Sequence, residues 1–215
     1  MKLFDYWRSS AAFRMRIALN LKGLEFEREF IHLRRKDQIS ESYLAVNSQG
    51  LVPALVDDDG TVLTQSIAMI EYLDETHPEG ARLMPGDAEG RARVRAISQA
   101  IACEIHPLNN LRVLRHLGQT FGIDDKTRNR DWYAHWIAVG MLGVEGLLAN
   151  HPATGDFCHG DTPSLADICL VPQIFNAQRF GCDMSGYPTA MAINARCLAL
   201  PAFRDALPDN QPDAE

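Results

Sequence analysis

The chain has 215 residues, of which 46% are hydrophobic and 23% are charged. These proportions are those of an ordinary globular protein and exclude a disordered chain, which has fewer apolar residues and a larger charge imbalance. A formal net charge of −7 argues against a nucleic-acid binder, which needs a dominant basic surface.

Short strand and helix signals alternate over the first eighty residues. Gly23 ends one helical pattern, and the run from Asp57 to Gly60 is a strong hairpin turn signal. Ser66 is expected to cap a helix that Pro78 stops. The resulting order is βαβαββα, with strands at residues 2–6, 26–31, 51–56 and 62–64, helices at 11–22 and 66–77, and a weaker helix signal at 34–45.

No strand pattern persists in the second part of the chain. Residues 78–86 contain two prolines and two glycines, which is typical of a linker. Helical periodicity follows over residues 91–117, 130–148, 165–180 and 188–198. We therefore expect an α/β domain over residues 1–80, a linker over 81–86 and an all-helical domain over 87–215.

The cysteines and the N-terminus indicate the compartment. The five cysteines are odd in number and widely spaced, which favours buried thiols in a reducing cytoplasm. No pair has the C-x-x-C spacing of a zinc site, so no metal is expected. The N-terminus reaches a charge before a signal-peptide core could form, and no apolar run has the roughly 20 residues of a membrane span.

Ser9 and Ser10 lie where the first strand joins the first helix. Backbone N–H groups and the helix dipole favour an anion at such a place. A hydroxyl there either caps the helix, which is the commoner role, or donates a hydrogen bond to a bound thiolate or carboxylate. Arg14 shares a helical face with apolar residues, which favours packing over contact with a substrate.

Two further segments could also have either a local structural role or a role in ligand binding. Pro53 follows Val52 at the start of a strand, which favours a turn and leaves the bond open to the cis form. A cis bond would turn the Val52 amide and carbonyl outward, toward a peptide-like ligand, whereas the alternative is an ordinary edge-strand proline. Gln65 and Ser66 begin a helix and could either hold a carboxylate or cap that helix.

Taken together and in this order, the three segments resemble a zeta-class glutathione transferase. The matching patterns are S-S-x-x-x-R-x-R-I-A-L at residues 9–19, N-x-x-G-x-V-P-A-L at 47–55 and Q-S-x-A-x-I-E-Y-L at 65–73. The helical part agrees at residues 105–114 and 161–173. The resemblance spans nearly the whole chain and implies a thioredoxin-like N-terminal domain followed by a helical C-terminal domain.

The resemblance implies glutathione as the cofactor. Ser9 is expected to donate to its sulfur, and the Val52 backbone to pair with its cysteinyl unit. Gln65 and Ser66 are expected to hold its γ-glutamyl carboxylate. The residues implied for cofactor binding are Ser9, Ser10, Val52, Gln65, Ser66, His106 and Asn110.

His106 and Asn110 are four residues apart, so on a continuous helix they share a face, and Pro107 is expected to bend that helix. Without the family pattern they would read as helix-surface residues. Ser164-x-x-Asp167 is a capping box, to which we assign a folding role. Many animal zeta proteins have a cysteine directly after the two serines, and Ala11 stands there in this chain.

The activity implied is glutathione-dependent cis–trans isomerisation of maleylacetoacetate, in tyrosine and phenylalanine breakdown. A double bond of this kind cannot rotate until a nucleophile adds to it, so we expect thiolate addition, rotation and elimination. Ser9, Ser10 and Arg8 are the expected catalytic residues. Arg8, Arg112 and Arg179 are expected to bind the substrate carboxylates, because the planar guanidinium matches two carboxylate oxygens.

Other functions remain open from the sequence. Maleylpyruvate isomerisation uses the same chemistry on a shorter substrate, and a conjugating or dehalogenating glutathione transferase would consume its cofactor. A non-catalytic binding module is disfavoured, because Ser9, Ser10, Val52, Gln65 and Ser66 are all present. The expected partners are a small dicarboxylate substrate and, in a homodimer, a second copy of the chain.

Overall fold

The computed structural model describes residues 1–215 as two units. The first contains Met1–Met84 together with Ala199–Glu215, and the second contains Pro85–Leu198. The prediction gave residues 87–215 to the helical domain, whereas the structure groups the last seventeen of them with the α/β unit. Nothing local in the sequence indicates this, because the C-terminal segment makes its hydrogen bonds with residues near the N-terminus.

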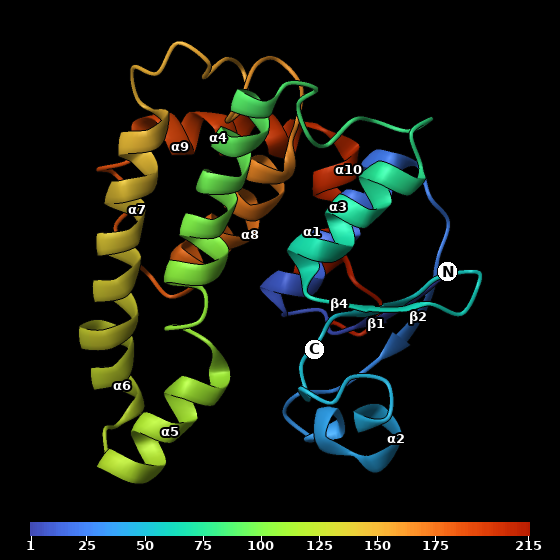
Figure 1. Cartoon of the computed structure of the whole chain (residues 1–215). Coiled ribbons are helices and arrows are strands. Elements are labelled where there is room, and N and C mark those ends of the chain that lie inside the picture. Colours follow the sequence, from blue (N-terminus) through green and yellow to red (C-terminus); the bar gives the residue numbers. More distant parts are fainter. The chain divides into compact units, whose positions relative to one another are not determined.

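The first unit has the predicted order βαβαββα (Figure 1). Its first part contains β1 (Lys2–Asp5), α1 (Ser10–Lys22), β2 (Glu27–Phe30), the 3-10 turn η1 (Asp37–Ile39) and α2 (Glu41–Leu44). It continues with β3 (Ala54–Val56), β4 (Val62–Thr64) and α3 (Ser66–Thr76), and the C-terminal segment adds α10 (Pro201–Arg204) and the 3-10 turn η4 (Pro208–Asn210).

The four strands form a mixed sheet in the order β2-β1-β3-β4. β1 is parallel to β2 and antiparallel to β3, in a register that pairs Leu3 with Leu55. Helices α1, α3 and α10 lie on one side of this sheet and α2 on the other (Figure 1). The thioredoxin-like fold expected for this part of the chain is confirmed.

Local signals set the ends of these elements. Gly23 ends α1 with φ 67°, a left-handed conformation that glycine adopts without a Cβ clash. The predicted hairpin turn joins β3 to the antiparallel β4, with Gly60 at φ 89°. The prediction that Ser66 caps α3 is wrong. Gln65 occupies the cap position and makes no side-chain cap bond, while Ser66 is the first helical residue and is buried.

The second unit is helical, as predicted. It contains α4 (Ala88–Gln99), the π-helix η2 (Ala100–Ile105), α5 (Leu111–Phe121), α6 (Asp125–Thr127), the π-helix η3 (Arg128–Tyr133), α7 (Ala134–Leu148), α8 (Leu165–Arg179) and α9 (Pro188–Ala199). The capping box at the start of α8 is confirmed: the Ser164 amide donates to Asp167 Oδ2 at 2.8 Å. Burial raises the pKa of the Asp167 carboxyl.

The prediction of one continuous helix over residues 91–117 is wrong. The helical backbone ends at Ile105, a turn follows, and α5 begins only at Leu111. Pro107 lacks an N–H, and the Asn110 side chain caps the new helix by accepting from the Arg112 amide at 3.0 Å. Periodicity across the break misled the prediction, because it cannot distinguish one helix from two with the same apolar side.

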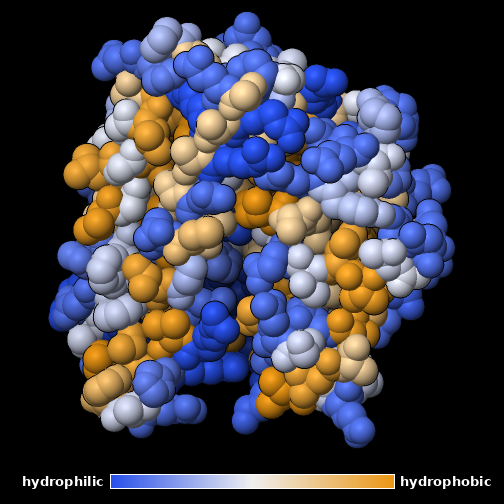
Figure 2. Space-filling model, viewed as in Figure 1, coloured by the Kyte–Doolittle hydropathy of each residue, from blue (hydrophilic) through white to orange (hydrophobic).

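Helix α7 leaves apolar side chains in the solvent. Val139 and Leu142 are 52% and 68% exposed, and Leu147 is 40% exposed. Figure 2 shows hydrophobic surface gathered along this helix. No helix in the structure combines the length and the apolar character that crossing a bilayer requires.

Candidate active site

Ser9 lies at the N-terminus of α1, in the loop that leaves β1. Its amide donates to the Tyr6 carbonyl at 2.9 Å, and its Oγ accepts from the Ala12 amide at 3.2 Å. The capping role is therefore real. Because the oxygen acts as the acceptor in that bond, the hydroxyl hydrogen remains available to an anion at the positive end of the helix dipole. Ser10 follows as the first helical residue and is buried.

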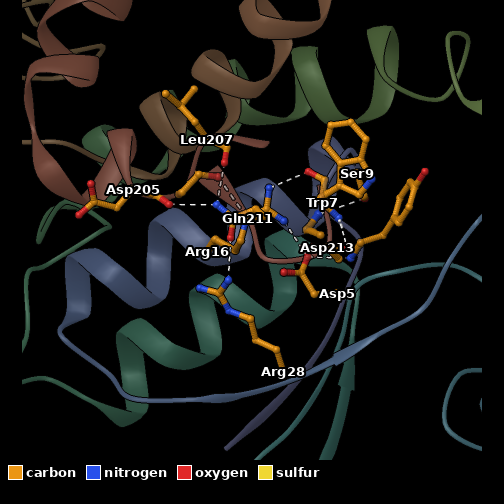
Figure 3. Close-up of polar contacts among 12 residues, drawn as sticks. Asp5, Trp7, Ser9, Arg16, Arg28, Asp205, Leu207, Gln211 and Asp213 are labelled. Carbon is orange, nitrogen blue, oxygen red and sulfur yellow. Dashed lines mark hydrogen bonds and ion pairs between the residues drawn. The ribbon is translucent and has the colours of Figure 1, made fainter. Parts of the chain in front are cut away.

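Buried charges hold this loop in place (Figure 3). Arg16, on α1, donates to the Trp7 carbonyl at 3.0 Å and to Asp5 Oδ1 at 2.7 Å. Both partners of this ion pair are fully buried. Burial raises the pKa of Asp5, and the Arg16 guanidinium opposes that rise. The pair therefore fixes the backbone two residues before Ser9.

The C-terminal segment completes the support of the loop (Figure 3). Asp213 Oδ2 accepts from the Trp7 amide at 3.0 Å, and the Ala206 carbonyl accepts from Arg16 Nε at 3.1 Å. Gln211 Oε1 accepts from Arg28 at 2.7 Å. No sequence signal pointed to these contacts, because the partners are more than 180 residues apart.

Arg8 and Trp7 lie side by side immediately before Ser9. The Arg8 guanidinium carbon is 5.3 Å from the centroid of the Trp7 ring, which is a cation–π distance. The Arg8 side chain is half-buried, and the Trp7 ring N–H is buried without a hydrogen-bond partner in the chain. Trp7 is thus a candidate functional residue that the sequence analysis did not single out.

The Val52–Pro53 bond is cis, the form that the sequence left open. The Tyr43 hydroxyl and the Asn47 amide both donate to the Leu51 carbonyl, at 2.6 and 2.7 Å, and so fix the chain just before Val52. The amide and carbonyl of Val52 itself make no hydrogen bond within the chain. They are free to pair with an extended, peptide-like ligand.

Gln65 and Ser66 begin α3, and the structure joins them to two other segments. The backbone of Gln65 has a positive φ of 69°. Its side-chain amide donates to Gln49 Oε1 at 2.9 Å, which connects α3 to the loop before Val52. Ser66 Oγ accepts from Arg14 at 3.3 Å, which ties α3 to α1. All the predicted site residues of the first unit thus belong to segments that this unit brings together.

In the second unit, His106 and Asn110 do not share a helical face, contrary to the prediction. His106 follows the last residue of η2, and Asn110 caps α5 across a turn. The turn is held by the Trp132 ring N–H, which donates to the Leu108 carbonyl at 2.8 Å. Arg112 lies in the first turn of α5 and is exposed.

Arg179 is connected to the turn between η2 and α5 through stacked aromatic side chains. Its guanidinium carbon lies 5.2 Å from the Phe180 ring centroid, and Phe180 stacks on Tyr133 at 3.9 Å. The Tyr133 carbonyl accepts from Asn109 at 3.4 Å. The structure therefore groups Arg179 with the turn that carries His106 and Asn110. Trp132 and Tyr133, which make the connection, were missed, although an adjacent pair of large aromatic residues is a visible signal.

The five cysteines of the chain all lie in the second unit. Cys158, Cys169 and Cys197 are buried. Burial raises the pKa of the thiols of Cys158, Cys182 and Cys197, which keeps them protonated. Any thiolate chemistry in the first unit therefore depends on sulfur from a ligand.

The chain is similar to known proteins over nearly its whole length. A family model described as glutathione S-transferase, N-terminal domain, matches residues 8–76. A probable maleylacetoacetate isomerase of Vibrio cholerae is 50% identical over 214 residues, which are 99% of this chain and 97% of that protein. The solved structures include a holo maleylpyruvate isomerase, described as a bacterial zeta-class glutathione S-transferase, with a TM-score of 0.96, 47% identity and full coverage of both chains.

A second solved structure holds ligands. It is a maleylacetoacetate isomerase from Methylobacterium extorquens with bound malonate and glutathione, and it has a TM-score of 0.96, 42% identity and full coverage of both chains.

Proposed function

Because this chain belongs to the zeta class of the glutathione transferase family, we propose that it is a glutathione-dependent cis–trans isomerase that converts maleylacetoacetate to fumarylacetoacetate. The observation that carries the proposal is the start of α1, where Ser9 caps the helix with its oxygen and keeps its hydrogen for an anion. The reaction belongs to tyrosine and phenylalanine breakdown.

The residues of the first unit fit glutathione. A γ-glutamyl tripeptide needs a backbone partner, a carboxylate site and a donor to its sulfur. Val52 offers an unpaired amide and carbonyl, Gln65 and Ser66 stand at the N-terminus of α3, and Ser9 offers a hydroxyl hydrogen. Ser10 packs beside Ser9 at the start of α1. When bound, glutathione supplies a nucleophilic thiolate that adds reversibly to the substrate double bond and leaves unchanged.

Ser9 and α1 perform the electrostatic part of the chemistry. The Ser9 hydroxyl donates to the sulfur, and the helix N-terminus stabilises negative charge there, so the thiolate persists near neutral pH. The Asp5–Arg16 pair and Asp213 keep the loop fixed, so this donor does not have to be reoriented during the reaction.

Arginines bind the carboxylates of the substrate. Arg8 is adjacent to Ser9 in the loop, and we assign it to the carboxylate and developing enolate nearest the reacting carbon. Arg112 and Arg179 are exposed in the second unit and are assigned to the remaining carboxylate. His106 and Asn110 are assigned to glutathione. A forked guanidinium suits a dicarboxylate, because it donates two parallel hydrogen bonds to each carboxylate.

The experiment that tests this function follows maleylacetoacetate absorbance with purified protein, with and without a catalytic amount of glutathione. We expect loss of absorbance only with glutathione, and without consumption of glutathione. Stoichiometric consumption would identify a conjugating or dehalogenating transferase instead. Failure to bind immobilised glutathione would favour a non-catalytic module.

Maleylpyruvate is the second candidate substrate, and the likeness to a maleylpyruvate isomerase of 47% identity favours including it. The two substrates differ in the length of the acyl tail. A kcat/KM for maleylacetoacetate above that for maleylpyruvate supports the proposed assignment, and the reverse order transfers the assignment to maleylpyruvate.

The proposed function includes a homodimer in the cytoplasm. The odd cysteine count favours a reducing compartment. Exposed apolar side chains, as on α7, are typical of surfaces that bind a partner. Light scattering on the purified chain should give twice the 24.0 kDa monomer mass, and a monomer at micromolar concentration would contradict the homodimer.

A further inference from the structure

Arg14 is a buried arginine with most of its hydrogen-bonding groups unused. It lies on α1 and is 2% exposed. Its one hydrogen bond runs from Nη1 to Ser66 Oγ at 3.3 Å, whereas Nε and Nη2 are buried without a partner. No carboxylate of the chain forms an ion pair with it.

Arg16, two residues further along α1, shows what a compensated buried arginine needs. It is fully buried and bonds through Nε, Nη1 and Nη2 to the Ala206 carbonyl, Asp5 and the Trp7 carbonyl. The same helix therefore holds one guanidinium that the fold satisfies and one that it does not. A buried charge without a partner destabilises a protein, so Arg14 has no evident purpose in folding alone.

The position of Arg14 next to the N-terminus of α3 indicates a role in binding an anion. Its Nη1 contacts the first residue of α3, whose free backbone N–H groups and dipole already favour an anion. Because Ser66 Oγ accepts from Arg14, the Ser66 hydroxyl hydrogen points away from Arg14 and is available as a donor. The uncompensated positive charge lies directly behind that donor.

We propose that Arg14 is a positioning residue for glutathione, which orients the Ser66 hydroxyl and supplies the charge that makes the start of α3 a site for the γ-glutamyl α-carboxylate. The inference rests on the proposed function. Arg14 itself stays buried, and the ligand carboxylate becomes its missing counter-charge through the Ser66 hydroxyl.

The test compares two ligands by calorimetry: glutathione, and γ-aminobutyryl-cysteinyl-glycine, which lacks only the γ-glutamyl α-carboxylate. We expect the wild type to prefer glutathione roughly tenfold or more, the scale of a charge-assisted hydrogen bond. In Arg14→Met this preference should fall toward one, with little change in the Kd of the analogue. Arg14→Lys keeps the charge and should retain part of the preference.

Three further measurements separate positioning from a structural role. Arg34→Met makes the same change at an exposed arginine and should leave the ligand preference unchanged. In Ser66→Ala the preference should fall as well, and adding Arg14→Met should change it little further, because the two residues act together. The ligand-free Arg14→Met protein should unfold at a higher temperature than the wild type, since it loses an unpaired buried charge.

The outcomes are distinct. An unchanged preference in Arg14→Met, an equal loss for both ligands, or a variant that fails to fold would overturn the role of Arg14 and leave the proposed function standing. A wild type that binds neither ligand would overturn the proposed function, and this inference with it.

Discussion

At the scale of single residues, Ser9 and Ser66 use their hydroxyl groups in the same way. Ser9 Oγ accepts from the Ala12 amide and Ser66 Oγ accepts from Arg14, at 3.2 and 3.3 Å. Each bond occupies the oxygen and leaves the hydroxyl hydrogen for a ligand. Capping and ligand binding, which the sequence presents as alternatives at Ser9, are therefore compatible roles of one side chain.

Ser9→Ala should separate these two roles. Loss of the cap is expected to lower the free energy of unfolding by about 1 kcal/mol. Loss of the donor to the thiolate should lower kcat/KM roughly 10- to 100-fold and raise the pKa of bound glutathione, which its thiolate absorbance measures. Ser40→Ala removes a similar cap bond, to the Tyr43 amide at 3.3 Å, and should change only stability. A pKa of bound glutathione in Ser9→Ala that equals the wild-type value would exclude the proposed donor.

Gln65 illustrates a conflict between stability and binding. Its φ of 69° and ψ of 107° are costly for a residue with a Cβ. Gln65→Gly should therefore raise the free energy of unfolding by about 1 kcal/mol while weakening glutathione binding. Lys36→Gly relieves a similar φ of 67° at an exposed position and should leave binding unchanged. Denaturant unfolding and calorimetry on the same preparations measure the two effects. Tighter glutathione binding by Gln65→Gly would contradict the assignment of Gln65 to the γ-glutamyl carboxylate.

At the scale of elements, the turn between η2 and α5 depends on its neighbours. Trp132 and Tyr133 hold it through the carbonyl of Leu108 and the amide of Asn109. Both aromatic residues lie in the π-helix η3, and η2 is also a π-helix. Single π-turns within helices are often found at functional sites, which agrees with the proposed roles of His106 and Asn110.

Two glycines of α7 provide a matched test of this turn. A Cβ at Gly140 would overlap the side chain of Ile105, the residue before His106, whereas a Cβ at Gly143 meets nothing within 4 Å. Gly140→Ala should destabilise the protein by about 1–3 kcal/mol and lower kcat/KM. The β-branched side chain of Ile105 has few alternative rotamers, so the overlap must displace its backbone and with it the turn. Gly143→Ala should stabilise it by about 0.5–1 kcal/mol. Equal effects of the two changes, measured by thermal unfolding, would show that the Ile105 contact is unimportant.

At the scale of the whole molecule, the chain's last residues support its first. Asp213, Gln211 and the Ala206 carbonyl bond to Trp7, Arg28 and Arg16. The α/β unit is therefore incomplete until the C-terminal segment has been synthesised, and the loop that carries Ser9 is fixed only when both ends of the chain are present.

Asp213→Ala should show this dependence. It removes the acceptor of the Trp7 amide, so we expect a loss of about 1–3 kcal/mol in the free energy of unfolding and weaker glutathione binding. Asp209→Ala removes an exposed carboxylate from the same segment and should change neither quantity. Matching values for the two variants in denaturant unfolding would show that the segment does not support the loop.

The sequence by itself determined the features that depend on neighbouring residues. Gly23 ends α1 because only the residue at that point must adopt a positive φ, and the turn after Asp57 joins two strands that are adjacent in the chain. The order of elements in the first unit, the family and the cofactor followed from such local motifs. The break at Pro107 was misjudged, because an apolar period continues across it.

Only the tertiary structure decided which polar groups are satisfied. Arg14 and Ser66 are 52 residues apart, Arg16 and Ala206 are 190 apart, and Trp7 and Asp213 are 206 apart. Both arginines occupy similar positions in one helix, and the sequence gives no sign that one is compensated and the other is not. That difference depends on which distant groups the fold places within about 3 Å of each guanidinium, because a hydrogen bond forms only over such a distance.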